Sequence, residues 1–231
     1  MSREPKLAVL LPFKVPNQDF VPYNKRIFAQ DAEILTLEKG RRAKETPVDG
    51  AITLREEVQA ILQAQQDGYD ALLVGCYLDV GVQEGRTLAD MPVFGVAETS
   101  LRVCAMLGDR VGILTTSPYA KRGIESNLRR WGMERLACVR CLGMPVEQVF
   151  SAEPEQLAGA VSQAVLEMIE KDHITVTTFG SGALYRVYEL VQKQLLDRGY
   201  DLPIVNSNRA AIETVRALTR LGLKQSRSTY P

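Results

Sequence analysis

The sequence has a single histidine, His173, and only four cysteines among its 231 residues. With one imidazole, a Ser-His-Asp triad and a histidine-rich metal site are both poor candidates, and we expect no bound metal. Four cysteines in a chain of this length do not form the pattern of a disulfide framework, so we expect thiols in a reducing compartment.

Net charge and long apolar runs are also lacking. The 28 basic and 28 acidic residues balance, which leaves no long-range field to attract nucleic acid or an anionic membrane. No apolar run approaches the roughly 20 residues that span a bilayer, and the first residues lack the apolar core of a signal peptide. With 45% hydrophobic residues, the chain is predicted to be a globular cytoplasmic protein that handles a small molecule.

Short apolar runs alternate with segments of helical periodicity. Strands are predicted at residues 6–11, 71–75, 111–114, 174–179 and 202–205, and helices at 55–66, 154–171 and 210–221. This alternation is typical of βαβ units, and the uninterrupted apolar character of the runs indicates that helices cover both faces of a parallel sheet. The predicted class is α/β.

A repeat relates the two parts of the chain. The run that ends in Gly75-Cys76 recurs 105 positions later as the run that ends in Gly180-Ser181. The same offset places residues 7–11 on 112–116 and residues 32–37 on 137–142. We interpret the shared offset as two copies of one α/β unit.

The predicted fold is therefore two pseudo-symmetric parallel-sheet α/β halves. The first half comprises residues 1–100 with 206–231, and the second comprises residues 101–205. If the copies face each other about a pseudo-twofold axis, Cys76 and Ser181 meet across the cleft between the halves, where we expect the active site.

The strand ends carry the candidate chemistry, because ligands of open parallel sheets bind outside the carboxyl ends of the strands. Cys76 is expected to open the next helical segment, whose dipole and backbone N–H groups would lower the thiol pKa and give a base or nucleophile. The alternative reading of Cys76 is a buried, space-filling residue. Ser181 is equally well explained by a tight turn.

The strand at 111–114 is followed by Thr115, Thr116, Ser117 and Pro118, which have the form of a helix N-terminus with Ser117 as its cap. Such an end can bind a carboxylate, for which Thr116 is the better ligand candidate. Cys138 and Cys141 have the spacing of half a metal site but no second pair, and we interpret them as strand core.

Four short segments carry a family resemblance. Residues 75–81 (Gly-Cys-Tyr-Leu-Asp-Val-Gly) are similar to Gly-Cys-Phe-x-Asp-Pro-Gly, residues 92–98 to Pro-Val-x-Gly-x-x-Glu, residues 107–110 to Leu-Gly-x-Arg, and residues 222–226 to Gly-Leu-x-x-Ser. These are motifs of the aspartate/glutamate/hydantoin racemase superfamily, and within it of the hydantoin and allantoin racemases. The resemblance covers nearly the whole chain.

The resemblance implies proton chemistry without a cofactor, in which one cysteine thiolate removes the hydrogen next to a carbonyl and a second thiol returns a proton to the opposite face. Cys76 matches the first cysteine. The second is expected in Gly-Cys-Ala-Gly, but residues 180–183 read Gly-Ser-Gly-Ala. Ser181 is the second catalytic candidate, although an unperturbed hydroxyl is too weak an acid and too weak a base to mirror a thiol.

A second departure lies at the end of the first strand, where Asn-Pro-Asn-Thr of the family becomes Leu-Pro-Phe-Lys at residues 11–14. The lost amides and the new cation suggest a changed substrate, with a carboxylate that Lys14 could meet. The expected substrate-binding residues are Pro12, Phe13, Lys14, Tyr77, Thr115, Thr116, Gly180 and Gly182.

The leading hypothesis is a cofactor-independent racemase or isomerase of the hydantoin racemase type, acting through Cys76 and Ser181 on a cyclic ureide or related amino-acid derivative. Three alternatives stay open. They are a single-cysteine lyase similar to arylmalonate decarboxylase, a covalent isomerase or hydrolase similar to maleate isomerase, and a ligand-binding protein without catalysis. The resemblance also implies a homo-oligomer.

Overall fold

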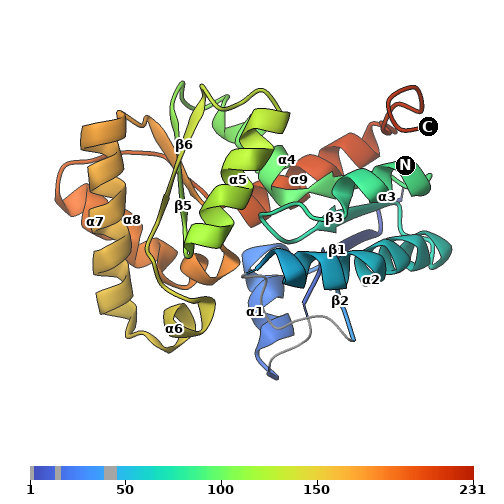
Figure 1. The fold of residues 1–231 in the computed structure, drawn as a ribbon, viewed down its shortest axis with the longest axis horizontal. Coiled ribbons are helices and arrows are strands. Elements are labelled where there is room, and N and C mark those ends of the chain that lie inside the picture. The colour runs from blue at the N-terminus through green and yellow to red at the C-terminus, as the bar shows by residue number, and fades with distance from the viewer. Residues whose placement is uncertain (1–2, 14–16, 39–45) are drawn as a thin grey trace. The chain divides into compact units, whose positions relative to one another are not determined.

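The strands form two separate four-stranded sheets in the computed structural model, which describes residues 3–13, 17–38 and 46–231 (Figure 1). The first sheet has the order β2-β1-β3-β4 and the second the order β6-β5-β7-β8, and every pairing is parallel. The strands are β1 (Leu7–Leu11), β2 (Glu33–Thr36), β3 (Ala71–Val74), β4 (Val93–Gly95), β5 (Val111–Thr115), β6 (Ala137–Cys141), β7 (Val176–Phe179) and β8 (Ile204–Val205). The predicted α/β class with two parallel sheets is confirmed.

The strands alternate with helices along the whole described chain. The helices are α1 (Phe20–Ile27), α2 (Pro47–Gln66), α3 (Val82–Leu88), α4 (Val96–Cys104), α5 (Pro118–Arg130), α6 (Val146–Ser151), α7 (Pro154–Asp172), the 3-10 helix η1 (Gly182–Val187), α8 (Tyr188–Asp197) and α9 (Ser207–Arg220). Among the helices described, none is both long enough and apolar enough to cross a membrane.

The chain divides into two compact units, Met1–Thr99 with Asn208–Pro231 and Ser100–Ser207. Each unit contains one of the two sheets. The unit boundaries lie within two residues of the predicted halves, 1–100 with 206–231 and 101–205. That each half is a folding domain of its own, and that an active site lies in a cleft between them, stay predictions.

The inner strands of both sheets are buried over their whole length, namely β1, β3, β5 and β7. Strands that are covered on both faces are mostly apolar and show no alternation of polar and apolar residues. In β7 the buried hydroxyls of Thr177 and Thr178 donate to the carbonyls of Gly112 and Val205. The core of the first unit includes Leu10 and Leu72 from these strands and Ile61 from α2.

The backbone pairing shows how closely the two sheets repeat. Gly75 donates its N–H to the Leu10 carbonyl at 2.8 Å, and Gly180 donates to the Leu114 carbonyl at the same distance. The offset is therefore 105 between β3 and β7 but 104 between β1 and β5. The expected match of residues 7–11 with 112–116 is wrong by one residue, a shift that would turn every side chain to the opposite face of the strand.

Local side chains mark the starts of two helices, α5 and α2. Ser117 caps α5 as predicted, since its hydroxyl accepts the N–H of Ala120 at 3.2 Å and Pro118 is the first helical residue. The start of α2 was predicted eight residues too late. Thr46 and Asp49 form a capping box there, with the Asp49 carboxylate accepting the Thr46 N–H at 2.9 Å.

We predict that Gly75→Ala lowers the free energy of unfolding by about 1–3 kcal/mol, because its new methyl group would overpack the core against Leu11, Val9 and Phe28. Urea denaturation measures the change. The control is Gly159→Ala in α7, where nothing lies within 4 Å and the loss of a helical glycine should stabilise the protein by about 0.5–1 kcal/mol. Equal effects of the two substitutions would contradict the packing argument.

Candidate active site

Cys76 is the first residue beyond Gly75, at the carboxyl end of β3. It is buried, with 9% of its surface exposed, and the adjacent Tyr77 is buried as well. Pro12 and Phe13 follow β1, the parallel neighbour of β3; Pro12 is buried and Phe13 is half-buried. The structure thus brings these four predicted residues to one edge of the first sheet, whereas Lys14 lies outside the described residues.

The expectation that Cys76 opens a helix is wrong. Helix α3 begins at Val82, and the residues between form a turn in which Asp79 donates its N–H to the Cys76 carbonyl at 2.9 Å. Asp79 (φ 48°) and Gly81 (φ 79°) both have left-handed backbone conformations, which a right-handed helix cannot include. Cys76 is therefore several residues away from the dipole of α3.

The carboxylate of Asp79 holds this turn against the next helix. It accepts the N–H of Ala97 at 3.0 Å and the N–H of Glu98 at 2.9 Å, both in the first turn of α4. Gly95 leaves the room for this contact, since a Cβ at that position would collide with the carboxylate. The segment after Cys76 is thus tied to the helix that follows the neighbouring strand, β4.

Asp79 is buried, with 9% of its surface exposed, and other charged groups lie near it. Burial raises the pKa of the Asp79 carboxyl to about 7, the two N–H groups of α4 lower it, the nearby Glu98 carboxylate raises it, and Arg86 lowers it. Glu98 and Arg86 form an ion pair of 3.0 Å, with 15% and 8% of their side chains exposed. A carboxyl group with a pKa near 7 exists in both charge states at neutral pH.

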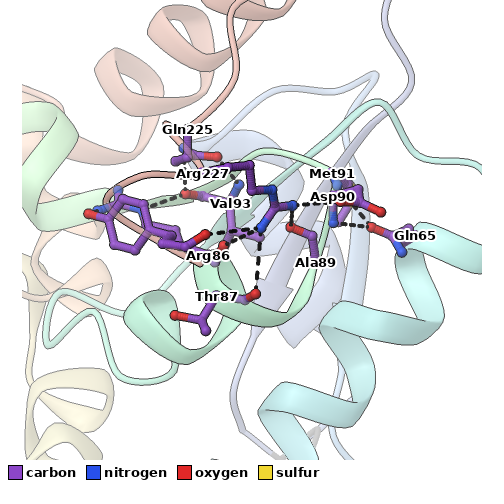
Figure 2. Close-up of polar contacts among 10 residues, drawn as sticks. Gln65, Arg86, Thr87, Ala89, Asp90, Met91, Val93, Gln225 and Arg227 are labelled. Atoms are coloured by element: carbon purple, nitrogen blue, oxygen red, sulfur yellow. Dashed lines mark hydrogen bonds and ion pairs between the residues drawn. The ribbon is translucent and has the colours of Figure 1, made fainter.

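The C-terminal segment closes the outer edge of β4, as Figure 2 shows for Gln225 and Val93. The Gln225 side chain accepts the Val93 N–H at 3.1 Å and donates to the Val93 carbonyl at 3.0 Å. Both backbone groups point away from β3, because Leu72 of β3 pairs with Pro92 instead. The amide of Gln225 thus occupies the place of a further strand and protects the edge from pairing with another chain.

Arg227 fixes the same segment to the end of α3 (Figure 2). Its guanidinium donates to the carbonyl oxygens of Arg86 and Ala89 and forms an ion pair of 2.8 Å with Asp90. A cation at this position stabilises the carbonyl groups that end a helix. The motif at residues 222–226 therefore leads into contacts that hold α3 and β4, the two elements that follow the Cys76 turn in the sequence.

The predicted residues of the second unit lie at the carboxyl ends of β5 and β7. Thr115 donates its hydroxyl to the Gly180 carbonyl at 3.2 Å, which joins the two strand ends. Thr116 is buried, Ser181 is half-buried and Gly182 is exposed. The structure brings these five residues to one edge of the second sheet.

Tyr185 makes in this unit a contact similar to that of Asp79 in the other. It lies in η1, directly after the Ser181 turn, and its hydroxyl accepts the Ser207 N–H at 2.8 Å and lies 2.9 Å from the Ser207 hydroxyl. Ser207 begins α9, the helix that follows the outer strand β8. The sequence analysis missed the roles of Asp79 and Tyr185, because the sequence does not reveal in which direction these side chains point.

The four cysteines are thiols and differ in their surroundings. Burial raises the pKa of the Cys104 thiol in α4 to about 12 and that of the Cys138 thiol in β6 to about 11, so both are held protonated at neutral pH. Cys138 and Cys141 lie in strand β6, as predicted, but both are half-buried on this edge strand, so their assignment to the core is wrong. Cys76 is the cysteine that stands at the carboxyl end of an inner strand.

Two parallel sheets, each with a small polar residue after a glycine at the end of an inner strand, define a class of two-unit α/β proteins. A model of the Asp/Glu/Hydantoin racemase family matches residues 26–215, more than half of the chain, and the chain belongs to this family. The hydantoin racemase of Pseudomonas sp. (strain NS671) is 25% identical over 193 residues, which cover 83% of this chain and 75% of that protein. The hydantoin racemase of Rhizobium meliloti is 23% identical, with 79% and 74% covered.

Solved structures share the fold. The allantoin racemase of Klebsiella pneumoniae superimposes with a TM-score of 0.82 at 21% identity, covering 96% of this chain and 90% of that one. A liganded variant of arylmalonate decarboxylase, with one glycine replaced by cysteine and one cysteine by serine, gives a TM-score of 0.69 at 17% identity and covers 95% and 94%. The predicted fold and the predicted family are both confirmed.

We predict that Asp79 makes the protein less stable as the pH rises from about 4 to 7. Its folded-state pKa of about 7 exceeds the ordinary value of 3.8, so between these values the folded protein binds more protons than the unfolded chain. Its stabilising contribution is complete below pH 4 and is lost as the pH rises to 7. The expected loss over this range is on the order of a few kcal/mol, at about 1.4 kcal/mol for each tenfold difference in proton affinity.

The measurement is urea denaturation of the wild type and Asp79→Asn from pH 4 to 8. We expect the free energy of unfolding of the wild type to fall relative to that of the variant up to pH 7 and then to run parallel to it. A constant difference across the whole range would show that Asp79 does not titrate in this window.

Proposed function

We propose that this protein is a racemase or isomerase of the hydantoin racemase type, which uses Cys76 for proton transfer at a carbon next to a carbonyl. Its substrate is a cyclic ureide or a related amino-acid derivative. The observation that carries the proposal is a cysteine after a glycine at the carboxyl end of β3, in a chain that belongs to the Asp/Glu/Hydantoin racemase family.

In the proposed reaction the Cys76 thiolate takes the proton of the substrate C–H bond, and the electron pair of that bond moves to the carbonyl oxygen as an enolate. Return of a proton to the other face of the carbon gives the opposite enantiomer. Donors around the enolate oxygen contribute strongly in such reactions. The candidates are Thr116 and the backbone N–H groups that follow Cys76 and Ser181.

Ser181 differs from Cys76 in chemistry although both follow a glycine at matching strand ends. A serine hydroxyl does not ionise near neutral pH, so the second proton comes from Ser181 in concert with another group, or from water. Thr115 already donates its hydroxyl to the Gly180 carbonyl, which favours a supporting role for it. Pro12, Phe13, Tyr77, Gly180 and Gly182 complete the proposed substrate contacts, together with Lys14.

A single-cysteine lyase is the second candidate, because only one of the two matching strand ends carries a thiol. In that reaction Cys76 would protonate the enolate left by loss of carbon dioxide. Both reactions place the same thiol beside the same carbon, and the fate of the carbon skeleton distinguishes them.

We predict that the wild type exchanges the hydrogen next to the carbonyl for deuterium and that Cys76→Ala loses at least about a thousandfold in rate, since general acid–base groups contribute 10²–10⁴-fold. Proton NMR in deuterated water, with 5-substituted hydantoins, allantoin, amino acids and arylmalonates, follows this signal. Cys141→Ser, on the edge strand β6, is the matched control and should keep the wild-type rate.

Loss of the signal with an intact skeleton supports the racemase. Release of carbon dioxide from an arylmalonate would instead establish the lyase. Turnover that survives in Cys76→Ala, with circular dichroism showing a native fold, would remove Cys76 from the mechanism.

We predict that Ser181→Cys raises the racemisation rate by at least about tenfold, because a second thiol can donate and accept a proton at neutral pH. Polarimetry of one enantiomer of a reactive hydantoin measures the rate, and Cys76→Ala/Ser181→Cys tests whether the new thiol works alone. An unchanged rate would show that position 181 does not act as the second acid or base.

A further inference from the structure

Three segments of the first unit converge on one buried side chain. The backbone N–H of Asp79 is bonded to the Cys76 carbonyl, its carboxylate accepts two N–H groups of α4, and its left-handed conformation sets the path toward α3. Strand β4, which leads into α4, pairs with β3 at Val74 and Gly95, one residue before Gly75. A shift of the Asp79 carboxylate would therefore move the turn that begins at Cys76.

The second unit contains the same arrangement with different chemistry. Tyr185 follows Ser181 by four positions, as Asp79 follows Cys76 by three, and each side chain reaches the first residues of the helix after the outer strand. Burial raises the pKa of the Tyr185 hydroxyl from its ordinary value of 10.0, so it stays neutral at physiological pH. Of these two groups, only the Asp79 carboxyl, on the side of the thiol, can change its charge near neutral pH.

The charged groups around Asp79 come from three helices. Glu98 is on α4, Arg86 is on α3 and forms an ion pair with Glu98, and Glu57 of α2 lies against Gly81 at the far end of the turn. The Glu98 carboxylate disfavours a negative charge on Asp79, whereas Arg86 and the N–H groups of α4 favour it. Burial is the largest effect, and together with these groups it raises the pKa of the Asp79 carboxyl to about 7.

We propose that Asp79 is a positioning residue for Cys76: its carboxylate fixes the turn after Cys76 onto the first turn of α4 and so couples the reactivity of the thiol to its own ionisation. The reaction that Cys76 serves is taken from the proposed function; the effect of Asp79 on the reactivity of the thiol does not depend on it. Because burial favours the neutral form, the protonated carboxyl holds the turn most firmly, whereas ionisation favours conformations in which water reaches the carboxylate and so loosens the turn.

The test measures the thiol directly. Iodoacetamide alkylation of Cys76 is followed by mass spectrometry of its peptide from pH 5 to 10, for the wild type and for Asp79→Asn. The wild-type rate should show an inflection near pH 7 besides the ionisation of the thiol itself. Asp79→Asn should show the thiol ionisation alone, because its amide carries no titratable group.

Turnover gives a second readout on any compound that exchanges its hydrogen. Asp79→Asn can accept only one of the two N–H groups of α4, so kcat should fall about tenfold with KM less affected. Gly95→Ala displaces the carboxylate by crowding and should lower kcat in the same way, so it tests the contact if Asp79→Asn does not fold. Asp70→Asn is the control, since this carboxylate also accepts a backbone N–H, from Lys6 at 2.7 Å, but at the opposite end of β3.

The outcomes separate this proposal from the proposed function. Alkylation curves of the wild type and Asp79→Asn that superimpose would overturn the positioning role, and so would a wild-type curve with a single ionisation. If no compound reacts but the inflection near pH 7 disappears in Asp79→Asn and stays in Asp70→Asn, the positioning role is supported and the racemase proposal is not.

Discussion

The hydrogen bonds between Asp79 and the first turn of α4 are the interaction on which the first unit's candidate site depends. They join the end of β3, the start of α3 and the helix after β4 through one buried carboxylate. Two local features make this possible: the left-handed backbone of Asp79 itself and the missing side chain of Gly95. A helix that began at Cys76 would exclude the left-handed conformation of Asp79 and with it the contact to α4.

This arrangement has an energetic cost that the rest of the unit offsets. A buried carboxylate loses hydration, and the N–H groups of a helix N-terminus replace part of it. Arg86 is shared between the Glu98 carboxylate and the Val93 carbonyl, so the same guanidinium balances charge and holds the edge strand. The contacts of Gln225 and Arg227 then close the outer side of β4 and the end of α3.

The two sheets keep one backbone frame while their chemistry has diverged. Gly75 and Gly180 make the same hydrogen bond to a neighbouring strand, and each precedes the candidate residue of its unit. A side chain would not fit at either glycine, so the frame constrains the glycine and leaves the next position open to thiol or hydroxyl. The side chain that bonds to the following helix is the carboxylate of Asp79 in one unit and the phenol of Tyr185 in the other.

The sequence by itself determined the α/β class, the parallel inner strands, the capped start of α5 and the motif around Cys76, because these follow from periodicity and from residues close together in the chain. It placed Cys76 at a helix start wrongly, since two left-handed residues in a short turn leave no periodic signal. Only the tertiary structure decided that Asp79 meets α4 and that Gln225 pairs with Val93. Such contacts join residues 18 and 132 positions apart, and packing alone brings them together.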